Sequence, residues 1–201
     1  VERAPAIGQV LVIDGAAGNW PAAAPPLREL EALIADAPGG VPWGGFDERS
    51  PAGLCFTSGT TGAPKGVTYT HRASFLHTLR ALQADVMAFT RRDAVLAVVP
   101  MFHANAWGLP FALPAVGGKL VLPGRQADGA SLARLIAAEG VTVGVGVPTV
   151  WLGVVEHIEA AGGELPSLEG IIVGGAPVGP ALMEGNERRA GGTVQTGWGM
   201  T

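Results

Sequence analysis

Short apolar runs alternate along this chain with longer segments whose apolar residues recur every three or four positions. The apolar runs predict strands at 9–13, 54–57, 67–70, 94–99, 119–122, 141–147, 170–173 and 193–196. The segments with helical spacing predict helices at 27–34, 72–89, 106–116, 129–139, 149–161 and 180–190. Strands that alternate with helices are typical of βαβ units, so we predict an α/β fold with a mostly parallel sheet.

Residues 38–52 interrupt the alternation. They contain three prolines and several glycines, a composition typical of an irregular connection. We therefore predict that residues 1–52 form an edge segment and linker, and that residues 53–201 form the ligand-binding core.

The composition of the chain excludes several classes of protein and favours a folded domain. Hydrophobic residues make up 48% of the 201 residues and charged residues 15%, so the chain has enough apolar surface for a sizeable core. A formal net charge of −4 argues against a nucleic-acid-binding surface, which needs clustered Lys and Arg. A single cysteine excludes an internal disulfide, and no run of about 18 apolar residues predicts a membrane-spanning helix. A cytoplasmic setting fits these features.

Four polar or glycine-rich segments follow predicted strands, at 58–66, 100–105, 174–179 and 197–201. Open α/β sheets bind their ligands outside the carboxyl ends of the strands. We therefore expect these segments to meet at one binding site.

The segment 57–66 contains three glycines, four hydroxyl side chains and one lysine. Glycines let backbone N–H groups converge on an anion, hydroxyls add donors, and Lys65 adds a positive charge, so the loop suits a polyphosphate such as ATP. It is not a Walker A loop, because Pro64 precedes the lysine and Gly66 follows it. By composition alone, a surface hairpin loop is the alternative interpretation.

The order of the residues favours phosphate binding. Thr57-Ser58-Gly59-Thr60-Thr61-Gly62-x-Pro64-Lys65-Gly66 resembles the signature phosphate loop of the acyl-adenylate-forming superfamily, which includes acyl-CoA synthetases, luciferases and peptide-synthetase adenylation domains. The resemblance implies an ATP site formed by Thr57, Ser58, Gly59, Thr60, Thr61, Gly62 and Lys65. It also implies catalytic roles for Thr61 and Lys65 and a contact between Thr61 and Mg²⁺.

Three further segments resemble motifs of this superfamily, in its order. Pro100-Met101-Phe102-His103 is similar to the segment whose aromatic residue and histidine line the acyl pocket, which implies catalytic and substrate-binding roles for His103. Gly174-Gly175-Ala176-Pro177 resembles the turn that packs against the adenine ring. Thr196-Gly197-Trp198-Gly199-Met200-Thr201 resembles the motif whose aromatic residue flanks the adenine and whose threonine reaches the phosphate.

The segments His103–Gly108 and Val147–Trp151 look most like the medium- and long-chain fatty acyl-CoA ligases, with Trp107 near the acyl channel. The resemblance implies that a carboxylate, expected to be a fatty acid, attacks ATP to form an acyl-adenylate, and that CoA then displaces AMP. It also implies part of the large N-terminal domain, and allows a homodimer of the full-length enzyme. An adenylating enzyme with another acceptor and a non-catalytic nucleotide-binding module are the alternatives.

Both ends of the chain look cut, so we expect a fragment. The superfamily's ribose-binding aspartate, its hinge and its small C-terminal domain would follow Thr201. On that ground residues 1–201 alone are expected to be largely inactive.

Overall fold

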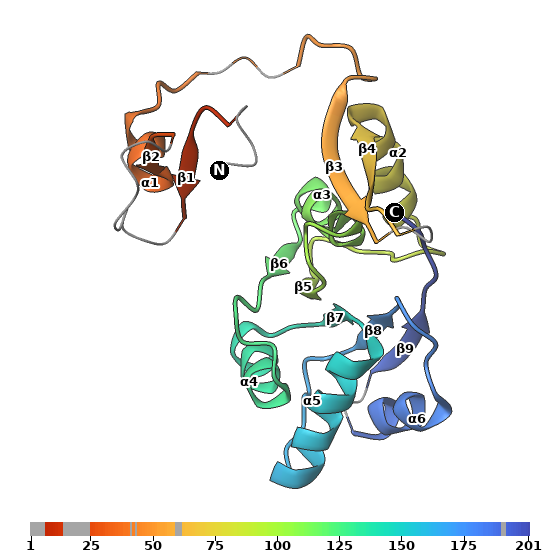
Figure 1. The fold of residues 1–201 in the computed structure, drawn as a ribbon. Coiled ribbons are helices and arrows are strands. Elements are labelled where there is room, and N and C mark those ends of the chain that lie inside the picture. The colour runs from red at the N-terminus through yellow and green to blue at the C-terminus, as the bar shows by residue number, and fades with distance from the viewer. Residues whose placement is uncertain (1–6, 14–24, 41, 43, 59–61, 190–191) are drawn as a thin grey trace. The chain divides into compact units, whose positions relative to one another are not determined.

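The computed structural model describes residues 7–13, 25–40, 42, 44–58, 62–189 and 192–201. The chain divides into two compact units, an amino-terminal unit, Val1–Phe46, and a main unit, Asp47–Thr201 (Figure 1).

The amino-terminal unit pairs two short parallel strands and adds one helix. β1 (Val10–Val12) pairs with β2 (Leu27–Glu29), and α1 (Leu30–Asp36) follows directly. The strand at 9–13 was therefore expected correctly, whereas the expected helix at 27–34 was wrong in its first turn. Pairing with β1 supplies hydrogen-bond partners to residues 27–29, and this pairing overrides their helical spacing.

A five-stranded, wholly parallel sheet forms the centre of the main unit, with the strand order β6-β5-β7-β8-β9. Its strands are β5 (Ala94–Val98), β6 (Lys119–Val121), β7 (Val143–Gly146), β8 (Gly170–Val173) and β9 (Thr193–Thr196). The predicted α/β fold with a mostly parallel sheet is confirmed.

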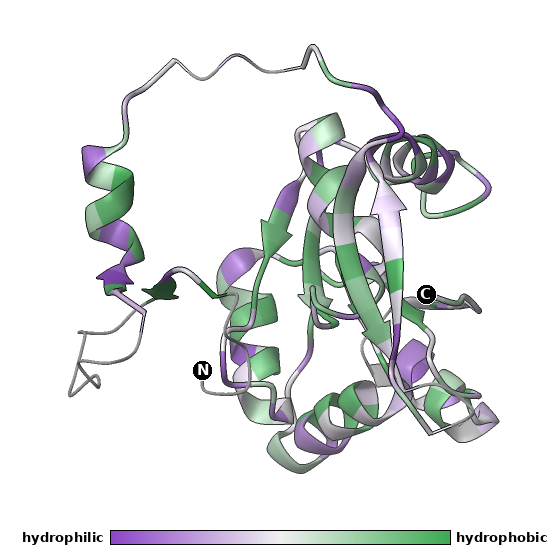
Figure 2. Cartoon of the chain, turned by 45° about the horizontal axis from the view of Figure 1, so that its top comes forward, coloured by the Kyte–Doolittle hydropathy of each residue, from purple (hydrophilic) through white to green (hydrophobic). Residues whose placement is uncertain are grey.

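Each face of this sheet carries its own core. On one face α4 (Gly129–Glu139), α5 (Pro148–Ala161) and α6 (Pro180–Arg189) cover a cluster that includes Leu96 and the fully buried Trp151. On the other face α3 (Leu109–Val116) covers Val95 and Val145. Successive strand residues point to opposite faces, so β5 contributes residues to both clusters. Figure 2 shows hydrophobic green along strands of the sheet, whereas the helices carry both green and purple residues.

An antiparallel hairpin precedes the sheet in sequence. β3 (Pro51–Thr57) pairs with β4 (Lys65–Thr70), and α2 (His71–Ala81) begins as soon as β4 ends. The phosphate-loop sequence joins β3 to β4, so the expectation of a loop between two strands is confirmed.

The expected helix at 72–89 was wrong beyond Ala81. The chain turns there, with the Met87 N–H donating to the Ala81 carbonyl at 3.1 Å and Ala88 at a φ of 53°. From β9, the side chain of Gln195 donates to the Val86 carbonyl at 2.6 Å. These contacts hold residues 82–88 in a loop against the sheet, although their apolar spacing continues the helical pattern.

The expected helix at 106–116 was wrong in its first turn as well. η1 (Ala104–Gly108) is a left-handed turn, since the φ angles of Ala104, Asn105, Ala106 and Trp107 lie between 47° and 55° and that of Gly108 is 82°. Left-handed backbone costs a residue with a Cβ roughly 1–2 kcal/mol. Four such residues in a row mark a segment whose shape the surrounding structure imposes.

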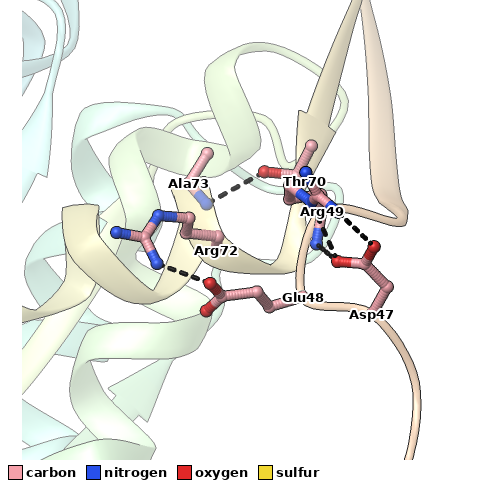
Figure 3. A network of polar contacts seen from close by, with 6 residues as sticks. All are labelled: Asp47, Glu48, Arg49, Thr70, Arg72 and Ala73. Carbon is pink, nitrogen blue, oxygen red and sulfur yellow. Dashed lines mark hydrogen bonds and ion pairs between the residues drawn. The ribbon is translucent and has the colours of Figure 1, made fainter.

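The start of α2 is tied to the segment before β3 (Figure 3). Thr70 caps the helix by accepting a hydrogen bond from the Ala73 N–H at 3.1 Å, while the Arg72 guanidinium pairs with Glu48. Asp47 accepts hydrogen bonds from Arg49, which lowers the pKa of the Asp47 carboxyl below its ordinary value. These contacts fix where the helix begins.

Replacing Thr70 with alanine is expected to lower the free energy of unfolding by about 1 kcal/mol, because the Ala73 N–H loses its cap. In a chain of this size that corresponds to a fall in melting temperature of about 2–4 °C. Thr68→Ala, an exposed position two residues earlier in β4, is the matched control for thermal melts. Equal melting temperatures for the two variants would show that the cap contributes nothing.

Candidate active site

A cavity of about 850 Å³ opens in the main unit where β5, β8 and β9 end and the β3–β4 hairpin reaches its loop. In the described part of the chain, residues in or next to both hairpin strands, α2, η1, α3 and β8 line it, together with the loop after α2 and the C-terminal segment. The lining residues are Thr57, Ser58, Lys65, Tyr69, Ala73, Ser74, His77, Met87, His103, Ala104, Asn105, Trp107, Gly108, Phe111, Ile172, Gly174, Gly175, Gly197, Trp198, Gly199, Met200 and Thr201. All four segments expected to meet at strand ends contribute to this lining.

Most of the residues singled out by sequence lie together here. Those that line the cavity are Thr57, Ser58, Lys65, His103, Trp107, Gly174, Gly175, Gly197, Trp198, Gly199, Met200 and Thr201. Gly62, Ala176, Pro177 and Thr196 are exposed beside it and do not line it. Gly59, Thr60 and Thr61 lie outside the described residues. The roles assigned to all of these residues, including metal binding by Thr61, stay predictions.

Lys65 enters the cavity from the first position of β4, where it is paired with Thr57 across the hairpin. The flanking strands therefore set the spacing between the lysine and the hydroxyl groups of Thr57 and Ser58. Among the described residues between β3 and β4 no helix begins, so what these residues offer an anion is backbone N–H groups, hydroxyls and the lysine charge.

Gly174, directly after β8, lies between the C-terminal segment and the indole ring of Trp107. A methyl group on this residue would lie 2.9 Å from the Gly197 carbonyl oxygen and 3.0 Å from the indole ring of Trp107. The Gly197 N–H donates to the Val173 carbonyl at 2.8 Å. Only glycine leaves room for Trp107 to approach the predicted adenine turn this closely, which places the predicted acyl and adenine sites side by side.

The sequence interpretation missed the contribution of α2 and of Tyr69 in β4. Ala73, Ser74 and His77 lie at helical spacing on one face of α2 and line the cavity with Tyr69. Partial burial raises the pKa of the Tyr69 phenol above its ordinary value, and nearby Cys55 adds to this shift. The phenol therefore remains a neutral hydrogen-bond donor at physiological pH.

The polar residues on one face of α2 were the feature of the sequence that could have predicted this contribution to the cavity. Phe75 and Leu79, two of the apolar residues whose spacing predicted a helix at 72–89, are 62% and 49% exposed in this unit, whereas Ser74 and His77 line the cavity. The His77 ring also packs on Gly108, where a methyl group would lie 2.6 Å from it.

The predicted Mg²⁺ has no set of protein ligands in the described part of the chain. No group of three or more His, Cys, Asp or Glu side chains there could hold a metal ion, and no described lining residue is acidic.

None of the helices in the described ranges combines the length and apolar character needed to cross a bilayer.

Comparison with known proteins gives a family match over nearly the whole chain. The model for the family described as AMP-binding enzyme matches residues 4–201. The medium-chain-fatty-acid–CoA ligase of Ectopseudomonas oleovorans is 43% identical over 183 residues, which cover 91% of this chain and 34% of that protein. The long-chain-fatty-acid–CoA ligase of Thermus thermophilus is 49% identical over 154 residues, covering 77% of this chain and 28% of that protein. The chain thus spans about a third of the length of such relatives.

Solved structures agree with this match. The inhibitor-bound N-terminal domain of FACL13 from Mycobacterium tuberculosis superposes with a TM-score of 0.75 at 27% identity, covering 89% of this chain and 46% of that one. The anthranilate CoA ligase AuaEII in complex with anthranoyl-AMP gives a TM-score of 0.81 at 20% identity, covering 97% of this chain and 37% of that one. The second likeness is one of fold alone.

Proposed function

The chain belongs to the AMP-binding enzyme family, and from this membership we propose that the whole protein is an AMP-forming fatty acyl-CoA ligase. One observation carries the proposal: a single cavity holds the phosphate-loop lysine, the glycine turn of β8 and the tryptophan of η1. The named activities of the relatives from Ectopseudomonas oleovorans and Thermus thermophilus support fatty acids as the substrate class.

The proposed reaction joins two anions, a carboxylate and the triphosphate of ATP. Its first half is attack of the carboxylate oxygen on the α-phosphorus, with pyrophosphate leaving. Because the reactants repel each other, the protein's contribution is to neutralise charge and to align the reacting atoms. Lys65 would supply positive charge to the phosphates, and Thr57 and Ser58 would donate hydrogen bonds to their oxygens.

Trp107 and His103 would line the acyl side of the same cavity. Met87, Phe111 and Ile172 add apolar surface to its wall, which suits an aliphatic chain. In the second half-reaction the thiol of CoA would attack the acyl carbonyl and release AMP. The acyl and nucleotide groups would meet near Gly174, where Trp107 packs on the turn that would face the adenine.

Mg²⁺ belongs to the proposal as the partner of ATP, and it would supply charge neutralisation on the phosphates. The described residues alone do not form its site. The proposal also includes a cytoplasmic setting, which the single free cysteine fits, and allows a homodimer of the whole protein.

Acyl-CoA formation tests the proposal. The whole protein, incubated with ATP, Mg²⁺, CoA and saturated acids of graded chain length, is expected to release AMP and form acyl-CoA in equal amounts. Pantetheine and a carrier-protein thiol in place of CoA separate a CoA ligase from an enzyme with another acceptor. AMP release with no transfer to CoA would contradict the proposed acceptor.

A further inference from the structure

We propose that Asn105 is a positioning residue, whose side-chain amide holds the left-handed turn η1 against strand β3. In doing so it fixes the acyl side of the cavity relative to the phosphate loop. The inference rests on the proposed function, because the alignment it explains is that of a carboxylate with ATP.

The backbone of η1 makes such a support necessary. Asn105 has φ 49° and ψ 43°, Ala106 has φ 47° and ψ 44°, and Ala104 also has a positive φ of 47°. Asparagine takes this conformation more readily than most residues with a side chain, whereas alanine does not. The turn therefore persists only where contacts outside it favour its shape.

The side chain of Asn105 provides a contact of this kind. The Cys55 thiol, at the centre of β3 and 2% exposed, donates to Asn105 Oδ1 with a sulfur–oxygen distance of 3.4 Å. A methyl group on Gly53 would lie 3.8 Å from Oδ1 and 3.9 Å from Nδ2, so the amide lies over the strand at ordinary contact distance. Fifty residues of chain separate the two partners.

Both partners of this contact belong to segments that continue into the lining of the cavity. β3 continues from Cys55 to Thr57 and the phosphate loop, while η1 carries Trp107 and follows directly after His103. A displacement of η1 from β3 would move the acyl wall without moving Lys65. A misplacement of about 1 Å between reacting groups can cost roughly 10²-fold in rate.

Asn105→Gly separates this role from backbone preference, because glycine keeps the left-handed turn accessible and removes only the amide. In the whole protein, we expect the rate constant of acid-dependent ATP–pyrophosphate exchange to fall by about tenfold or more, with the KM for ATP within about twofold of the unaltered protein. Cys55→Ala is expected to show part of this loss, and Cys55→Ser, which restores a donor, to recover it. An exchange rate for Asn105→Gly within twofold of the unaltered protein would overturn the proposal.

Alkylation of Cys55 tests the contact without activity. Peptide mass spectrometry after iodoacetamide treatment is expected to show Cys55 modified about tenfold faster in Asn105→Gly, since the turn no longer covers the strand. An unchanged alkylation rate would overturn the contact. Absence of acid-dependent exchange in the unaltered protein would instead contradict the proposed function, and the alkylation result would still decide whether Asn105 holds β3.

Discussion

Gly129→Ala is expected to lower the free energy of unfolding by about 3 kcal/mol, the upper end of the range for overpacking a core. Gly129 is the first residue of α4 and lies where α4 crosses α5. A methyl group there would be 2.0 Å from the carbonyl oxygen of Gly153 and 2.5 Å from its carbonyl carbon. Backbone atoms cannot relieve the clash by a change of rotamer as a flexible side chain can, so α4 or α5 has to shift away from the other.

Thermal melting measures this effect, with an expected fall of about 6–12 °C for a chain of this size. Gly153→Ala is the matched control at the same crossing. A methyl group at position 153 meets Gly129 atoms only at 3.9–4.0 Å, and alanine favours a helix interior over glycine by about 1 kcal/mol. Gly153→Ala is therefore expected to be neutral or stabilising. A melting temperature for Gly129→Ala equal to that of Gly153→Ala would show that the helices do not cross this closely.

Lys65→Ala is expected to reduce the rate of ATP-dependent adenylation by about 10²-fold, the usual cost of removing one preorganised charge stabiliser from a reacting anion. Lys65 lies at the first position of β4 and lines the cavity beside Thr57 and Ser58. Every other described side chain of the phosphate-loop sequence is uncharged. No neighbour on the hairpin can therefore replace its positive charge.

The only other lysine provides the control for Lys65. Lys119 pairs with Glu139 at 2.6 Å, neither residue lines the cavity, and both side chains are about half exposed. Such exposed pairs contribute at most about 1 kcal/mol to stability. Lys119→Ala should keep the full adenylation rate, and a comparable loss in both lysine variants would argue against a specific role for Lys65.

The sequence predicted those elements best whose ends are set by local chemistry. Helix α4 begins and ends at the predicted residues, because Asp128 accepts a hydrogen bond from the Ser131 N–H at 2.9 Å and Gly140 ends the helix at a φ of 59°. The Ser131 side chain, and after it the Ser131 backbone N–H, lower the pKa of the Asp128 carboxyl below its ordinary value by hydrogen bonding to it. Strands β8 and β9 also match their predicted bounds, since short apolar or β-branched runs between glycines leave few alternatives.

The predicted helix bounds were wrong where contacts with residues far away in the sequence override the local helical preference. Residues 82–88 leave the helical path under the hydrogen bond from Gln195, more than a hundred residues away. Residues 104–108 adopt left-handed backbone against β3, a conformation that no apolar periodicity indicates. In the same way, the motifs identified Lys65 and Gly174, but the lining from α2 depends on where the helix lies in the fold.

The reaction that we propose for this cavity joins a carboxylic acid to the AMP portion of ATP. Incorporation of labelled pyrophosphate into ATP by the whole protein, with and without a fatty acid and in the absence of CoA, tests it most directly. We predict exchange that requires the acid and proceeds without CoA, because the acyl-adenylate forms before the thiol enters. Exchange that is equally fast without any acid, or absent with every acid of a graded series, would contradict it.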